Sequence, residues 1–307
     1  MANVEKIRMV YLTSVEHSGS TLLACLLGGH PRVMTVGEFG TPFPKRGKCS
    51  CGSLYQDCVF WQKWAELAAE NSMPFDLGNF DINISPDPAG GFWEDLFYYQ
   101  FPLKTVDRIR DAFYLVLPQR NKAAQAKIDR SVKLARILCD AEGASIFLDT
   151  TKNPLQIRFL SQHQRVDLKV ICLVRDGRGV MNSLLTKEKT YTPESAVDSW
   201  LWGIRNMERT QRHYLDNSQV FFLKLEELCR QPEQKLAELL QFVGVEKDQV
   251  EFDYNQANRH IVGNRMRLFF DGTIRKPDEA WRRELSKENL ALFEAKAGDV
   301  NRKYGYE

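Results

Sequence analysis

The sequence predicts an α/β protein in which helices cover both faces of a central parallel β-sheet. Short apolar runs recur along the chain, and segments with apolar residues at helical spacing follow nearly all of them. Strands that alternate with helices in this way are typical of parallel sheets. Polar turns directly follow the runs that end at Val15 and Val174. Because such sheets bind ligands at the carboxyl ends of their strands, we expect the site at that edge.

The strands are expected at 9–15, 33–36, 145–148, 168–174 and 220–225. Helices are expected at 20–28, 154–163, 176–187, 194–215 and 232–242. Residues 40–143 interrupt this alternation, first with clusters of Pro and Gly and then, from about 104, with a charged helical pattern. We interpret 1–307 as a single domain and 40–143 as a cap inserted into it.

Composition excludes several classes of protein. With 307 residues, 43% of them apolar, the chain can bury a full core. Its 42 Lys and Arg against 40 Asp and Glu leave no basic excess, so no nucleic-acid partner is expected. The sequence has no run of 18 apolar residues and no apolar segment typical of a signal peptide at its start. We therefore expect no membrane span and a cytoplasmic location.

The turn after the first strand is the strongest functional signal. The sequence HSGST between an apolar strand and an apolar helix aims backbone amides, hydroxyls and a helix N-terminus at one point. This arrangement favours a bound phosphate or sulfate, although a merely well-capped turn would look similar. A nucleoside-triphosphatase loop would have lysine where Ser20 stands, so ATP with magnesium is disfavoured. The candidate ligand-binding residues are His17, Ser18, Gly19, Ser20 and Thr21.

A second basic group follows the fourth strand. Arg175 stands at the strand end, and Ser183 lies two helical turns further on. A guanidinium can bind a phosphate with two parallel hydrogen bonds, and a serine hydroxyl can add a neutral donor. Lys187, one turn beyond Ser183, is a weaker candidate contact. The alternative interpretation of the sequence RDGR at 175–178 is a surface turn with a salt bridge.

Four segments together resemble the sulfotransferase superfamily that uses 3′-phosphoadenosine 5′-phosphosulfate (PAPS), in the branch of the bacterial, tyrosylprotein and carbohydrate enzymes. They are EHSGSTLLACLLGGHPRVMTVGE, CSCGSLYQDCVFW, DTTKNPLQIRFL with the following CLVRDGRGVMNSLL, and RHIVGNRMR. The resemblance implies a three-layer, P-loop-like fold and transfer of a sulfuryl group to a hydroxyl, which leaves 3′-phosphoadenosine 5′-phosphate (PAP) and needs no metal. The expected acceptor is a small molecule, a carbohydrate or a peptide, and neither the acceptor nor the oligomeric state can be predicted.

The resemblance also assigns roles to residues. It implies that 17–21 contact the 5′-phosphosulfate and that Arg175 and Ser183 hold the 3′-phosphate. Glu38 would be the base that deprotonates the acceptor, and Lys152 would neutralise charge on the transferred group. Solvated surface roles for both are the alternatives. A C-terminal loop would close over the nucleotide through Gly263, Asn264 and Arg265, the last favoured over Arg267.

Two departures keep other functions open. His17 replaces the usual Lys or Arg before SGST, and it is only partly charged at neutral pH, with an ordinary pKa of roughly 6.5. A nearby dianion would favour its charged form, so it could still contact the nucleotide or assist catalysis. Leu225-Glu226 replaces the usual Tyr-Glu pair. The competing hypotheses are a P-loop small-molecule kinase and a catalytically silent nucleotide-binding protein.

Two further groups of residues remain ambiguous. Cys49, Cys51 and Cys58 are expected to be loop-packing thiols. A zinc site would lack an obvious fourth ligand, and a disulfide is not expected in a reducing cytoplasm. The aromatic residues of 92–101 are expected to pack between cap helices, or else to line an acceptor site.

Overall fold

The fold rests on a five-stranded sheet, shown in a computed structural model that describes residues 5–41, 47–84, 101, 103–116, 118–245 and 260–307. The strands are β1 (Ile7–Ser14), β2 (Val33–Gly37), β3 (Ile146–Asp149), β4 (Val166–Val174) and β5 (Val220–Lys224). All neighbours pair in parallel, in the order β2-β3-β1-β4-β5. The predicted fold class is confirmed, and each strand boundary lies within two residues of its expected place.

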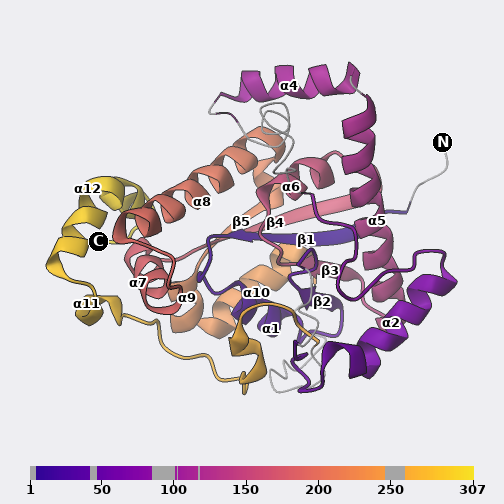
Figure 1. The fold of residues 1–307 in the computed structure, drawn as a ribbon, viewed down its shortest axis with the longest axis horizontal. Coiled ribbons are helices and arrows are strands. Elements are labelled where there is room, and N and C mark those ends of the chain that lie inside the picture. The colour runs from indigo at the N-terminus through magenta and orange to yellow at the C-terminus, as the bar shows by residue number, and fades with distance from the viewer. Residues whose placement is uncertain (1–4, 42–46, 85–100, 102, 117, 246–259) are drawn as a thin grey trace.

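Helices pack on both faces of this sheet (Figure 1). One face carries α1 (Ser20–Leu27), α9 (Leu225–Arg230) and α10 (Pro232–Val243). The other face and its flanks carry the remaining helices of the described chain. These are α2 (Val59–Glu70), α4 (Lys104–Val116), α5 (Pro118–Glu142), α6 (Pro154–Ser161), α7 (Gly177–Lys187), α8 (Pro193–Tyr214), α11 (Trp281–Glu284) and α12 (Lys287–Lys303).

The alternation of side chains along β1 divides the core into two parts. Val10 and Leu12 belong to the apolar cluster with α1 and α10, whereas Met9 and Tyr11 belong to the larger cluster on the opposite face. All four side chains are buried. A strand that is apolar on both faces is the pattern expected of the centre of a parallel sheet.

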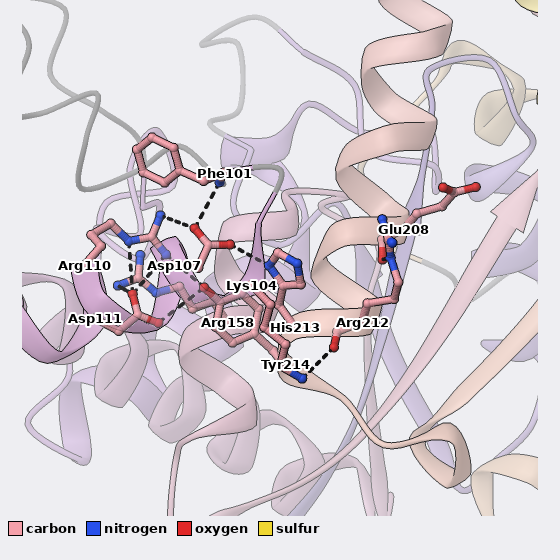
Figure 2. Close-up of polar contacts among 10 residues, drawn as sticks. All are labelled: Phe101, Lys104, Asp107, Arg110, Asp111, Arg158, Glu208, Arg212, His213 and Tyr214. Atoms are coloured by element: carbon pink, nitrogen blue, oxygen red, sulfur yellow. Dashed lines mark hydrogen bonds and ion pairs between the residues drawn. The ribbon is translucent and has the colours of Figure 1, made fainter.

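A buried ionic cluster attaches α4 to α6 and α8 (Figure 2). Asp107 of α4 accepts a hydrogen bond from the backbone N–H of Phe101 and pairs with Arg110 at 2.9 Å and with His213 of α8. Asp111 pairs with Arg158 of α6. These contacts connect α4 to α6 and α8, and removal of one partner would leave a buried charge uncompensated.

The stretch interpreted as a cap is only partly described. Its helix α5 packs against β2, β3 and α6, and α2 packs against α5. Of the aromatic residues in question, Phe92, Trp93, Phe97, Tyr98 and Tyr99 lie outside the described residues. The division into one domain with a cap at 40–143 therefore stays a prediction. None of the described helices is long and apolar enough to cross a membrane.

Candidate active site

The carboxyl ends of all five strands meet at a cavity of about 800 Å³. The residues that follow the strands supply much of its lining. After β1 these are Glu16, His17, Gly19, Ser20 and Thr21, after β2 Glu38, after β3 Lys152, after β4 Arg175, and after β5 Leu225 and Glu226. The cavity thus lies where ligands of parallel α/β sheets bind.

The loop after β1 leads directly into the N-terminus of α1. Gly19 is the N-cap residue of this helix and has φ +92°, a left-handed conformation. No side chain of the described residues forms a capping hydrogen bond with the first turn. This φ favours glycine, and a Cβ at Gly19 would also come within 2.5 Å of Cδ1 of Leu225, which would have to move. The first amides of a helix have no partner within it and carry the positive end of its dipole. The loop can therefore offer N–H donors to an anion in the cavity.

Backbone strain marks both sides of this cavity. His17 has φ +58° and Lys152 has φ +70°, conformations that residues other than glycine seldom adopt. Each costs on the order of 1–3 kcal/mol, and such strain persists where the surrounding structure imposes it, often at functional sites. Two other described residues share this feature, Ser72 and Asp81.

Arg175 connects the loop to helix α7. Its Nη1 donates to the backbone oxygen of His17 at 2.7 Å and to Oγ of Ser183 at 3.2 Å. Its Nη2 lies 3.7 Å from Oδ2 of Asp278. A Cβ at Gly179 would come within 3.1 Å of Nε, so glycine makes room for the guanidinium on α7. Arg175 is thus held at the cavity by contacts that leave its fork partly available for a ligand.

The two candidate catalytic side chains face each other across the β2 and β3 ends. Nζ of Lys152 lies 2.5 Å from Oε1 of Glu38, and both side chains are about four-fifths buried, with exposed fractions of 20% and 18%. The hydroxyl of Thr41 donates to Oε2 of Glu38 at 3.3 Å. An acceptor hydroxyl that reaches Glu38 would therefore also approach the Lys152 ammonium.

The turn that carries Lys152 is fixed by a buried carboxyl group. Oδ1 of Asp149 accepts from the backbone N–H of Thr151 at 2.8 Å. Burial raises the pKa of Asp149 to about 6, although its hydrogen bonds to Thr151 oppose the shift. Asn153 then caps α6, because its side chain accepts from the N–H of Leu155. These contacts hold Lys152 in its left-handed conformation.

The surroundings of His17 favour its neutral form in the free protein. Its side chain is 9% exposed, and Nε2 lies 3.6 Å from Oε1 of Glu188. Burial lowers its pKa, the nearby Lys187 and Arg175 lower it further, and the carboxylates of Glu16 and Glu188 only oppose these effects. Binding of an anion next to the ring would raise the pKa again.

A strap, residues 260–264, closes the β2 edge of the cavity. The N–H of Val262 donates to the backbone oxygen of Val36 at 2.7 Å, and the N–H of Glu38 donates to the backbone oxygen of Val262 at 3.1 Å. The N–H of Asn264 donates to Oγ1 of Thr21 at 3.1 Å. The strap therefore brings Gly263 and Asn264 to the cavity lining beside the α1 N-terminus.

Some predicted site residues do not line the cavity. Ser18 is buried, with no hydrogen-bond partner for its hydroxyl among the described residues, and Ser183 reaches the site only through Arg175. Arg265 is exposed and is not part of the lining. Arg267 donates to the oxygens of Gly263 and Lys48, which makes it a support of the strap. A direct role for Arg265 stays a prediction.

Other lining residues were missed by the sequence analysis. They come from the segment after the strap and from the loop after α7, and include Tyr191, Phe269, Phe270, Arg275, Lys276 and Asp278. The adjacent basic residues Arg275 and Lys276, between Gly272 and Pro277, were a usable signal for an anion site. No described residue of 40–143 lines the cavity.

Comparison with known proteins gives a family match. The model of the sulfotransferase family matches residues 95–249. Similar solved structures include the sulfotransferase domain from the Synechococcus PCC 7002 olefin synthase, with 16% identity, 100% of this chain and 98% of that chain covered, and a TM-score of 0.49. A Mycobacterium avium sulfotransferase has 13% identity, coverage of 100% and 78%, and a TM-score of 0.49. A mouse sulfotransferase complexed with PAP has 11% identity, coverage of 99% and 90%, and a TM-score of 0.40. No curated protein matches the sequence.

Proposed function

The chain belongs to the sulfotransferase family, and we propose that its cavity binds PAPS and transfers the sulfuryl group to a hydroxyl acceptor. The observation that carries this proposal is the convergence of three groups at one sheet edge. They are the α1 N-terminus with the HSGST loop, Arg175 next to that loop, and the Glu38–Lys152 pair. The products would be PAP and a sulfate ester.

Sulfuryl transfer makes demands that these groups can meet. As in phosphoryl transfer, charge builds on the leaving phosphate oxygen, the acceptor hydroxyl loses a proton, and attack is in line. Glu38 would accept the proton while the acceptor oxygen forms its bond to sulfur. The bond from sulfur to the bridging oxygen breaks, and its electrons remain on the 5′-phosphate of PAP. Lys152 and the amides of the α1 N-terminus would stabilise that charge.

The competing functions have less support. A magnesium-dependent kinase would need a lysine in the first loop, where this chain has Ser20. A catalytically silent nucleotide-binding protein would explain why Leu225 replaces the usual tyrosine. This leucine, however, lies against Gly19, and Glu226 accepts a hydrogen bond from the N–H of Asp176 at 3.1 Å. The Leu225-Glu226 pair thus supports both the loop and the start of α7.

Transfer of labelled sulfate from PAPS to a library of hydroxylated small molecules, carbohydrates and peptides tests the proposed reaction. We expect a labelled ester and one PAP released for each ester formed. If no acceptor in the library yields a labelled ester or accelerates the release of PAP, the result would support a catalytically silent protein instead.

Arg175→Ala should weaken PAP binding at least about tenfold, because a lost charge-assisted contact typically costs about 1.5–3 kcal/mol. The affinity for AMP, which lacks the 3′-phosphate, should fall much less. Titration calorimetry with both nucleotides measures the difference, and Arg205→Ala, an exposed arginine of α8, is the control. Equal losses for PAP and AMP would mean that Arg175 acts by holding the His17 carbonyl and not by recognising the 3′-phosphate.

The affinity for PAP should fall as pH rises from about 5.5 to about 8.5, across the ordinary pKa of His17. The pKa of His17 is lowered in the free protein, chiefly by burial, and the bound phosphates should raise it, so the complex takes up a proton between the two values. His17→Arg should remove this dependence, because guanidinium stays charged. Ionisation of PAP itself is common to both proteins. Parallel affinity curves for the two would contradict a charged His17 in the complex.

A further inference from the structure

Three cysteines and one histidine converge beside the strap, away from the cavity lining. They are Cys49, Cys51, Cys58 and His260, and their potential ligand atoms all lie within 4.8 Å of one another. Nδ1 of His260 is 3.3 Å from Sγ of Cys49 and 3.3 Å from Sγ of Cys58. Sγ of Cys51 is 3.6 Å from Sγ of Cys58. The sequence alone offered the three sulfurs, and the fold adds the nitrogen.

The distances of 3.3 and 3.6 Å are close to those between neighbouring ligand atoms of a tetrahedral zinc site. Zinc binds thiolate sulfur at about 2.3 Å and imidazole nitrogen at about 2.0 Å, which places neighbouring ligand atoms roughly 3.5–3.8 Å apart. A disulfide would need sulfurs about 2.05 Å apart, and all three cysteines are free thiols. Packing of a loop by thiols would not require an imidazole nitrogen that faces two sulfurs.

The local structure prepares these ligands. Lys48 pairs with Leu54 in a short hairpin, and Gly52, with φ +95°, makes the turn that carries Cys49 and Cys51. Cys58 stands at the N-cap of α2, and its Sγ lies next to that of Cys51. The ring of His260 stacks on Phe60 at 4.2 Å between centroids, which fixes its orientation.

We propose that Cys49, Cys51, Cys58 and His260 bind one zinc ion in a structural Cys₃His site. Four protein ligands leave no open position for a substrate, so this zinc does not take part in the reaction. Three sulfurs with one nitrogen favour zinc over the harder cations Mg²⁺ and Ca²⁺, which prefer oxygen. The site does not depend on the function proposed above.

The zinc would fasten the strap to the 48–58 segment. His260 is the first residue of the strap, and the N–H of Ile261 donates to Oγ of Ser50 at 2.8 Å. Beyond the strap, Arg267 donates to the oxygen of Lys48 at 3.0 Å. Loss of the metal should therefore loosen the segment around Gly263 and Asn264, and trypsin should cut the stripped protein faster at Arg265 or Arg267.

Metal analysis of the purified, reduced protein tests the proposal. We expect about one zinc per chain, and after chelation and refilling with Co²⁺ the absorption bands of a tetrahedral, thiolate-bound ion. Cys51→Ser and His260→Ala should each lose most of the bound metal at equal protein concentration. Cys51 is exposed, so its substitution should leave the fold intact by circular dichroism.

Matched controls distinguish this site from adventitious binding. Cys229→Ser and His163→Ala change a cysteine and a histidine outside the cluster, and both should keep one zinc per chain. A wild-type protein that retains no zinc and gives no cobalt spectrum would overturn the proposal. So would Cys51→Ser and His260→Ala variants that bind as much metal as the controls. Neither result would bear on the transfer of sulfate.

Discussion

Glu38→Gln should lower turnover by about 10²–10⁴-fold and leave the affinity for PAP nearly unchanged. The amide has the shape of the carboxylate but cannot accept the acceptor's proton, and loss of a general base typically costs this much. The ion pair with Lys152 at 2.5 Å is lost too, although the amide oxygen can still accept a hydrogen bond from Nζ. Single-turnover transfer from labelled PAPS measures the chemical step directly.

A matched control separates the base from a general effect of charge. Glu70→Gln removes a carboxylate from the exposed end of α2, outside the cavity lining, and should keep wild-type turnover. If Glu38→Gln turns over at the wild-type rate with the true acceptor, Glu38 is not the base. Wild-type turnover together with weakened PAP binding would instead place Glu38 in nucleotide binding.

Lys152→Ala should lower turnover by about 10²–10³-fold, since this is the typical cost of removing one donor that stabilises charge in the transition state. Lys152→Gly should lose as much turnover but be more stable than Lys152→Ala, by about 1 kcal/mol in the free energy of unfolding. The reason is the φ of +70°, which glycine adopts without strain and alanine does not. Chemical denaturation of both variants, beside single-turnover kinetics, measures the two effects.

The glycine–alanine pair also distinguishes chemistry from support. If Lys152 only fixed the turn between β3 and α6, glycine would restore the turn and with it part of the turnover. Equal turnover losses in two proteins of different stability would show that the ammonium group itself is needed. Recovery of wild-type turnover in Lys152→Gly would contradict the role proposed for this residue.

The sheet and the first loop could be predicted from the sequence because their signals are local. The run up to Val15 is apolar and is followed at once by glycine and hydroxyl residues, so strand, turn and helix can be recognised within one short window. Arg175 and Lys152 were found for the same reason, since each stands just after a strand. The common edge of parallel strands then brings them together.

Residues that act through distant contacts could not be predicted. His260 meets Cys58 across 202 positions of sequence, and no local pattern indicates which histidine completes the cysteine group. Likewise, the contact between Asp107 and His213 spans 106 positions and depends on how α4 packs against α8. The roles of Arg265 and Arg267 depend on which way each side chain points, which spacing alone does not determine.

Calorimetric titration with PAP, AMP and ATP, with and without magnesium, tests the central claim most directly because it needs no knowledge of the acceptor. We expect PAP to bind at least about tenfold more tightly than AMP or ATP, because the α1 N-terminus and Arg175 can each hold a phosphate. Because Ser20 stands where a nucleoside-triphosphatase loop has lysine, we also expect that magnesium makes no difference to these affinities. Tighter binding of ATP than of PAP, strengthened by magnesium, would contradict the assignment of this cavity to PAPS.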